Sequence, residues 1–247
     1  MATSTKNIIV GAADIFISSV NGDSRPATDN TTLAGLLPSG SSARTGLLQS
    51  ANYREVGYTS TGFEVSYEPN YGEVQVDQLL DAARLFKQTL KVMLKTELTE
   101  ATLENLTLSW GQMDSYYVNT TGSAINAVPT YSAVKVQSAD TAGATLNLAA
   151  GALGDAPVER TLIAVGNAPA YTQGSNFGAA GAQGSIRQKE RVYVARRVVS
   201  IDTTMHALKR DSATVFPVNF RCLPDDRATA YAGSEYGVVI DRVFGAV

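Results

Sequence analysis

Alternation of apolar and polar residues with a period of two is the feature that most constrains the fold of this chain. Side chains of a β-strand point alternately to opposite faces, so this alternation predicts strands with one buried face and one face in water. The clearest examples are residues 62–77 and 214–222. Residues 79–98 fit either a helix or a strand, and 87–98 are interpreted as a strand. Further strands are predicted at 8–18, 131–137, 144–149, 160–165, 190–205 and 236–244. The chain is therefore expected to be mainly β.

The first of these segments predicts a hairpin. In residues 62–77, apolar and polar residues alternate on both sides of a Pro-Asn-Tyr-Gly turn at 69–72. The polar face would carry four carboxylates and no basic residue: Glu64, Glu68, Glu73 and Asp77. Neighbouring strands usually place opposite charges across from each other. The acidic face is therefore either simply solvated or functional, and the residues leave both interpretations open.

One short helix is expected, over roughly residues 99–110. Thr99 is a suitable N-cap, because its side chain can accept a hydrogen bond from a free N–H of the first turn. Gly111 is a suitable residue to end the helix, since glycine readily adopts the left-handed conformation found there.

Two of the predicted strands carry irregularities. In residues 190–205, the pair Arg196-Arg197 interrupts the alternation and indicates a β-bulge. In residues 214–222, Pro217 has no N–H to donate, which indicates an edge position or a bulge.

Long stretches without any period separate the strands of what we take to be a single domain over 1–247. Connections in a domain normally run about 4–6 residues, so residues 19–57 are expected to be an arm that a partner orders. Its apolar residues suggest docking, with Leu36, Leu37, Leu47 and Leu48 as candidate contacts. Residues 112–185 are suspected to be an insertion, either a loop elaboration or an added outer-surface module.

Basic residues gather between 186 and 210, where seven Lys or Arg stand against Glu190 and Asp202. A nucleic-acid surface would need interleaved aromatic residues, and only Tyr193 is near. A contact with acidic surface on another copy is favoured over nucleic-acid binding. The candidate contact residues are Arg187, Arg191, Arg196 and Arg197.

Motifs for catalysis, cofactor binding or metal binding are missing from the sequence. It has no P-loop, no dinucleotide fingerprint and no zinc-protease or nucleophile-elbow motif. A single cysteine, Cys222, and a single histidine, His206, exclude an intrachain disulfide and clusters of several thiolates or imidazoles. We expect no enzyme, no cofactor and no metal. No secretory signal or apolar run of ~18 residues is present, so we expect no membrane association.

Five sequence stretches, taken in order, resemble the major tail protein (tail tube protein) of long-tailed bacteriophages. They are VGAADIF at 10–16, VGYTSTGFEVSYEP at 56–69, EVQVDQ at 73–78, LTEATLENL at 98–106 and FPVNFRCLPDD at 216–226. Their order is more specific than any one of them, and together they span most of the chain. Residues 112–185 fit the family pattern least well.

The resemblance implies a tail-tube-type β-sandwich or barrel with one short flanking helix and long loops. It also implies assembly into hexameric rings that stack as a hollow tube around a tape-measure protein. The tube would contact tail tip and tail terminator proteins and conduct DNA without binding it specifically. The protein would then belong to the virion tail and assemble in the host cytoplasm.

The tube gives the candidate residues expected roles. Glu64, Glu68, Glu73 and Asp77 would face the lumen and repel the phosphates of the passing duplex over about 10 Å. The arm at 19–57 would connect one ring to the next, and the basic stretch would contact a neighbouring subunit.

Other functions stay open at this point. One is a different virion structural protein: a capsid decoration protein, a head–tail connector or the tube subunit of a contractile machine. Another is a carbohydrate-binding β-sandwich, which would need surface tyrosines and Trp110 to line a groove. An enzyme is the least favoured alternative, because no carboxylate pair has a basic partner nearby in sequence.

Overall fold

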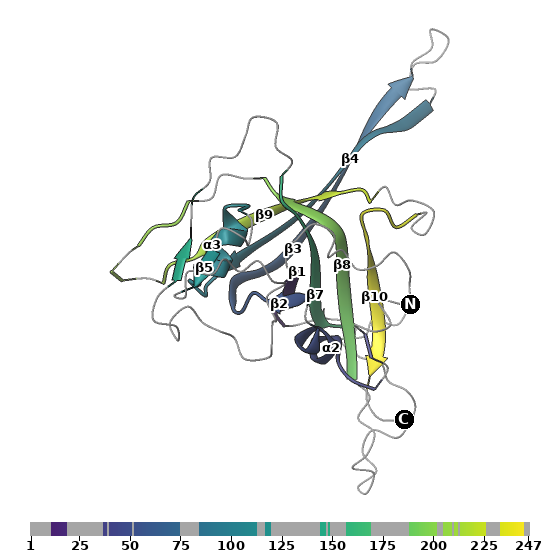
Figure 1. Cartoon of the computed structure of the whole chain (residues 1–247). Helices are drawn as coiled ribbons and strands as arrows, with labels where there is room; N and C mark the ends of the chain where they lie inside the picture. Colours follow the sequence, from purple (N-terminus) through teal and green to yellow (C-terminus); the bar gives the residue numbers. More distant parts are fainter. Residues whose placement is uncertain are drawn as a thin grey trace, which may run out of the picture.

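The protein is mainly β, with an antiparallel sheet and two short helices in the computed structural model (Figure 1). The structure describes residues 11–18, 37–38, 40–50, 52–74, 84–112, 117–119, 144–146, 148, 157–168, 188–201, 205–208, 210–211, 213–225 and 233–244. The mainly-β, sandwich-like fold expected from the sequence is thus confirmed. The strand expected at 131–137 lies outside the described residues.

Eight strands form one sheet in the order β2-β1-β7-β8-β9-β4-β3, with β10 paired to β8 off this path. They are β1 (Asp14–Ser18), β2 (Tyr53–Glu55), β3 (Thr59–Val74), β4 (Arg84–Leu98), β7 (Glu159–Asn167), β8 (Gln188–Ser200), β9 (Phe216–Leu223) and β10 (Gly237–Phe244). Two further strands, β5 (Tyr117–Asn119) and β6 (Ala144–Leu146), pair with each other. Most neighbours in the sheet are far apart in sequence.

Strand β8 divides the sheet. Its first half pairs with β10 and its last four residues, Arg197–Ser200, pair with β9. Between the two halves, the register against β7 shifts by one residue, since Leu162 lies opposite Ala195 but Arg160 lies opposite Val198. This confirms the bulge predicted at Arg196-Arg197. Such a bulge bends its strand, and β9, β4 and β3 continue the sheet from the bent half.

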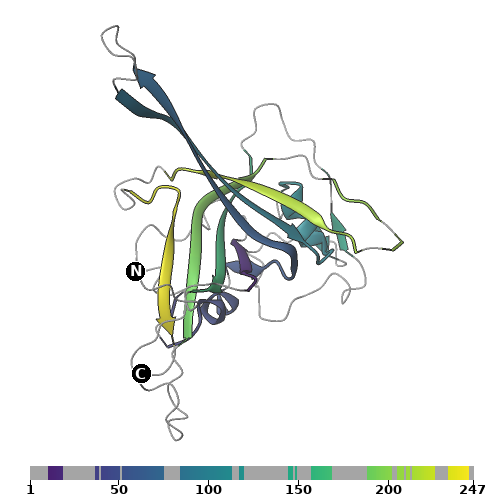
Figure 2. The same ribbon diagram turned by 180° about the vertical axis from the view of Figure 1, so that it is seen from behind.

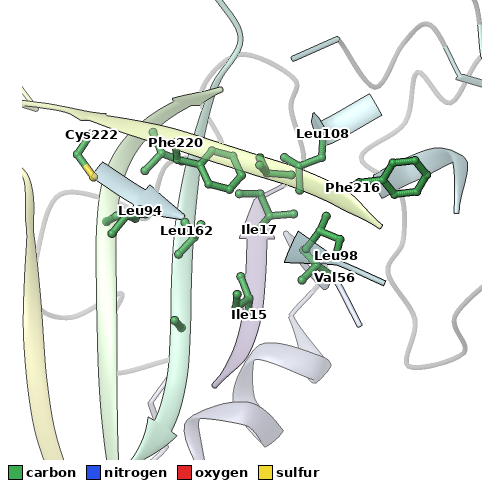
Figure 3. Packing of buried hydrophobic residues seen from close by; sticks show 14 residues of the cluster. Ile15, Ile17, Val56, Leu94, Leu98, Leu108, Leu162, Phe216, Phe220 and Cys222 are labelled. Carbon is green, nitrogen blue, oxygen red and sulfur yellow. The ribbon is translucent and has the colours of Figure 1, made fainter. Parts of the chain in front are cut away.

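The strands beyond the bulge pack back over one face of β1 and β7. Ile15, Ile17 and Leu162 share a buried cluster with Leu94 on β4 and Phe220 on β9, as Figure 3 shows. Strands β1 and β4 are not neighbours in the sheet, so they can share a core only if the sheet curls. Cys222 belongs to the same cluster and is therefore a buried core residue.

The opposite face of β1, β7 and β8 is also buried. Phe16, Ile163 and Val192 point to a second cluster, which includes Leu47 of the helix α2 (Ala43–Gln49). Burying each large apolar side chain contributes about 1.5–3 kcal/mol. Strands β1 and β7 therefore lack the wet face that simple alternation would predict, and they read as nearly continuous apolar runs.

The helices correct the sequence-based prediction in two ways. Helix α3 (Leu103–Ser109) begins at Thr102 and not at Thr99, because the Thr102 hydroxyl accepts a hydrogen bond from Asn105 N–H. Thr99 instead bonds to the carbonyl of Tyr58. Gly111 follows the helix at φ +62°, as expected. Helix α2 was not expected at all, and it lies inside the segment assigned to an arm.

The predicted hairpin within 62–77 is wrong in its pairing. Strand β3 continues through Pro-Asn-Tyr-Gly and pairs with β4 from Thr59 to Val74. Pro69 is tolerated because β3 is the last strand of the sheet, where an N–H toward solvent is not needed. Gly72 does not have the positive φ that a tight turn would require.

Candidate assembly surface

The outer part of the β3–β4 hairpin leaves the body of the protein, as both views show (Figures 1 and 2). We call residues 65–74 of β3 and 84–91 of β4 the hairpin arm. Its large apolar side chains are uncovered: Tyr67 is 61% exposed, Tyr71 56% and Leu85 60%. Exposed apolar groups at this density mark an interaction surface more often than a solvated one.

One face of the arm continues the hydrophobic core outward. At its base, Phe63 and Val92 pack against the first cluster, and the Phe63 ring meets the Tyr193 ring edge to face at 5.9 Å. Farther out, Tyr67 and Tyr71 lie on the same face, by the alternation of β3. This face of the hairpin therefore packs on the core at its base and is exposed to solvent farther out.

We call the face of the arm that carries Tyr67 and Tyr71 the tyrosine face. Lys87 contacts Tyr67 on this face. Lys87 Nζ donates a hydrogen bond to the Tyr67 hydroxyl over 3.0 Å and lies 5.3 Å from the centre of its ring. The bond raises the pKa of Lys87 above its usual value. Both side chains are exposed to a partner that could accept a charge and an aromatic ring together.

The opposite face of the hairpin carries paired charges and not acids alone. In the β3–β4 register Glu64 lies opposite Lys95, and Glu68 lies opposite Lys91. Glu73 lies opposite Leu85, on the tyrosine face. Asp77 lies outside the described residues. The four predicted acids thus do not share one face, because β3 continues through residues 69–72 and alternation places Glu73 on the face opposite to Glu64 and Glu68. The true partner strand also brings lysines that the predicted hairpin lacked.

The candidate arginines are engaged within the chain. Arg191 holds Asp241 with two hydrogen bonds of 2.5 and 2.7 Å, which keeps the pKa of that carboxyl below its usual range. Arg196 is buried and donates to the Ser234 carbonyl. Arg197 binds the Glu159 carboxylate and the Pro224 carbonyl. Arg187 lies outside the described residues.

These contacts change what a charge reversal would test. If Arg196 and Arg197 contacted another copy, replacing both by Glu would weaken assembly without unfolding the chain. Arg196 is only 4% exposed, so a carboxylate there would be buried without its partner. The substitution should therefore destabilise the single chain first, and it cannot report on a contact with another copy.

The leucines of the predicted arm also lie inside the chain. Leu47 is fully buried in the second cluster, and Leu37 and Leu48 pack against it. Leu36 lies outside the described residues. Leu47 is thus part of the core of the single chain, and Leu37 and Leu48 are partly buried beside it. The sequence missed this because a seven-residue helix with Gly46 at its centre has no strong period of its own.

Buried charges fasten α2 to the sheet. Glu190 Oε2 accepts from the Ser42 hydroxyl at 2.7 Å, and Oε1 accepts from Ala43 N–H at 2.8 Å. Arg242 Nε lies 2.7 Å from the same carboxylate and the guanidinium also donates to the carbonyls of Pro38 and Ser41. Sequence reasoning named Glu190 only as an acid within the basic stretch and did not name Arg242, since the groups that they bind in α2 and before it lie about 150 to 200 residues away.

The described residues offer little for catalysis. No group of three His, Cys, Asp or Glu among them could hold a metal ion. Burial raises the pKa of the Cys222 thiol to about 12. The His206 ring lies between the rings of Trp110 and Phe216, at 5.9 and 5.0 Å between centres. Neither described helix is long enough to cross a bilayer.

No protein-family model matches the chain, and no curated protein matches it.

Proposed function

We propose that this chain is a structural subunit that assembles into stacked rings, most plausibly hexameric, forming the hollow tail tube of a long-tailed bacteriophage. In this proposal the tube surrounds a tape-measure protein and conducts DNA during ejection, and the protein resides in the virion tail. The family named in this proposal rests on the resemblance of the five sequence stretches described above. The observation that carries the proposal is the hairpin arm, whose apolar face has no cover among the described residues of a single chain.

The arm gives a physical reason for self-assembly. Six of its large apolar side chains are exposed, four on the face of Tyr67 and two on the opposite face: Val65, Tyr67, Tyr71 and Leu85, and Val74 and Phe86. Burying even half of such a set against a neighbour contributes several kcal/mol, at about 1.5–3 kcal/mol for each complete side chain. A contact between two different surfaces of identical copies closes into a ring or extends as a filament, and both forms occur in a tube.

With the observed pairing of β3 and β4, the proposed lumen wall would carry lysines as well as acids. A bore lined by the face of Glu64 and Glu68 would also present Lys91 and Lys95. Such a wall repels DNA less than four unpaired acids would, but it offers no continuous positive track to hold phosphate. Cysteine labelling of assembled tubes at Glu64 would test it, because a lumen position reacts with a small reagent and is shielded from a bulky one.

The direct test is assembly itself. Purified protein at rising concentration is followed by sedimentation and negative-stain electron microscopy. We expect rings and tubes from the natural chain, and monomers from a variant carrying Tyr67→Ser, Tyr71→Ser and Leu85→Ser. The control is Leu208→Ser, which removes an even more exposed apolar side chain outside the arm, 88% exposed, and should leave assembly unchanged.

Three outcomes would redirect the proposal. A natural chain that stays monomeric at every concentration would refute self-assembly. A triple variant that assembles like the natural chain would refute the role of the arm. Closed rings that never stack would favour the head–tail connector over the tube.

A further inference from the structure

Strand β10 presents a free edge. Its only pairing among the described strands is with β8. The backbone N–H of Arg196, in β8, donates a hydrogen bond to the carbonyl of Tyr236 over 3.2 Å. The backbone carbonyl of Tyr236 therefore points toward β8. Bonding toward and away from a partner alternates along an antiparallel strand. The backbone N–H and C=O groups of Val239, Asp241 and Val243 therefore point away from β8.

This edge lacks the usual protection against strand addition. Natural edge strands carry proline, outward lysines or bulges. Strand β10 has no proline and no lysine, and it pairs with β8 over eight residues without a register shift. Asp241 forms a salt bridge with Arg191, and Arg242 forms one with Glu190. The edge of β3, by contrast, contains Pro69.

Residues 8–10, Ile-Ile-Val, are suited to fill such an edge. They are β-branched and were predicted to belong to the first strand, but β1 begins only at Asp14. Gly11 lies beside Asn167, because a Cβ added to it would meet Asn167 Nδ2 at 2.7 Å. Asn167 is opposite Glu190 and Glu190 is opposite Arg242. Gly11 and Arg242 thus belong to one row across the sheet.

The position of Gly11 in this row is too far from the open edge of β10 for residues 8–10 of the same chain to reach that edge. At about 4.8 Å per strand, the position beyond β10 lies four spacings, about 19 Å, from Gly11. Ile8 precedes Gly11 by three residues, which span at most about 11 Å when fully extended. A segment at that edge with this sequence must come from a second copy.

We propose that the open edge of β10 accepts residues 8–10 of a neighbouring copy as an added strand. This inference rests on the proposed self-assembly and names one of its contacts. The added strand would join subunits by backbone hydrogen bonds, independently of the apolar hairpin arm. Such strand addition takes its affinity from the main chain and its selectivity from alternate side chains.

A proline on the free edge tests the acceptor. Val239→Pro removes an N–H that points away from β8, so the single chain should keep its thermal midpoint within a few degrees. The variant should need roughly tenfold more protein to assemble, as expected for one lost hydrogen bond at each contact. Val239→Thr keeps the N–H and the strand preference and should assemble like the natural chain. Equal assembly by both variants would overturn the proposal.

Removal of residues 1–10 tests the donor. The shortened chain begins before β1 and should fold, and its assembly should weaken as much as that of Val239→Pro. Combining both changes should add nothing, because they remove the same contact. If the proline blocks assembly but the shortened chain assembles normally, another segment occupies the edge and the proposal is wrong.

Disulfide trapping separates this contact from the proposed function. Cysteine at Ile8, Ile9 or Val10 is combined with cysteine at Val239 or Val243, and Cys222 stays buried. We expect a ladder of covalent oligomers after oxidation, and only dimers when the two single variants are mixed. Ile9→Cys with Leu208→Cys is the control and should give no ladder. Tubes without a crosslink from any pair would refute the added strand, whereas a ladder without tubes would refute the tail tube.

Discussion

At the scale of single residues, Gly237 shows how closely the strands approach. Its φ is +155°, and a Cβ at this position would lie 2.0 Å from the Val194 carbonyl oxygen. Gly237→Ala must therefore displace β10 from β8, and we expect a loss of about 2–4 kcal/mol in the free energy of unfolding. Gly233→Ala is the control, since Gly233 also has a positive φ but open space around it. It should cost only about 1 kcal/mol. Urea denaturation measures both, and equal losses would contradict the predicted clash.

Cys222 supplies a prediction that depends on pH. Burial raises the pKa of its thiol from 9.0 to about 12. The folded state thus disfavours the thiolate, and its stability relative to the unfolded chain is complete below pH 9 and falls as the pH rises from 9 toward 12. At pH 8 a thiol reagent should label the unfolded chain in minutes and the folded chain only at its rate of opening. Rapid labelling of the folded protein would show that Cys222 is not in the core.

At the scale of elements, the Glu190–Arg242 pair decides whether α2 stays on the sheet. Removing one partner leaves the other charge buried, so Glu190→Gln and Arg242→Met should each cost about 3 kcal/mol. The double variant should cost clearly less than the sum, because no unpaired charge remains. A double-mutant cycle in urea measures the coupling. Purely additive losses would mean that the two side chains act independently of each other.

The elements also show what the sequence can predict. Strands β4, β9 and β10 and the bulge in β8 follow from local alternation and its interruption, which need no knowledge of the partner. The pairing of β3 could not be predicted in this way, because a register depends on which strand lies alongside. The same limit applies to the candidate site: Glu64 and Glu68 were identified, but the lysines opposite them belong to a strand that sequence reasoning treated separately. Helix α2 was missed because Leu47 gains its stability from Phe16 and Ile163, which are distant in sequence.

At the scale of the whole molecule, the body and the hairpin arm differ in what holds them. The body has two buried clusters on the two faces of β1, β7 and β8. The arm has only its own cross-strand pairs, and an isolated two-stranded ribbon is marginally stable in water. A single chain therefore keeps its arm at low stability, and an assembly that covers the tyrosine face would stabilise it. The arm and the β10 edge lie on different strands, so they offer two independent contacts to neighbours.

This division predicts that the arm can be removed without unfolding the body. Pro69 lies opposite Leu90, so replacing residues 70–89 by Asn-Gly closes β3 and β4 with a tight two-residue turn. Nearly all of the described side chains removed, in 70–74 and 84–89, are exposed, so the thermal midpoint should change by no more than a few degrees and the circular dichroism should stay β-rich. Assembly should weaken strongly, since exposed apolar side chains of the outer arm such as Tyr71 and Leu85 are removed while Tyr67 remains. A control with the same deletion joined by Ala-Ala should fold less well, because alanine does not favour the positive φ of that turn. A large drop in the midpoint of the Asn-Gly variant would show that the arm contributes to the core, and the argument that its apolar face is kept for a neighbour would then fail.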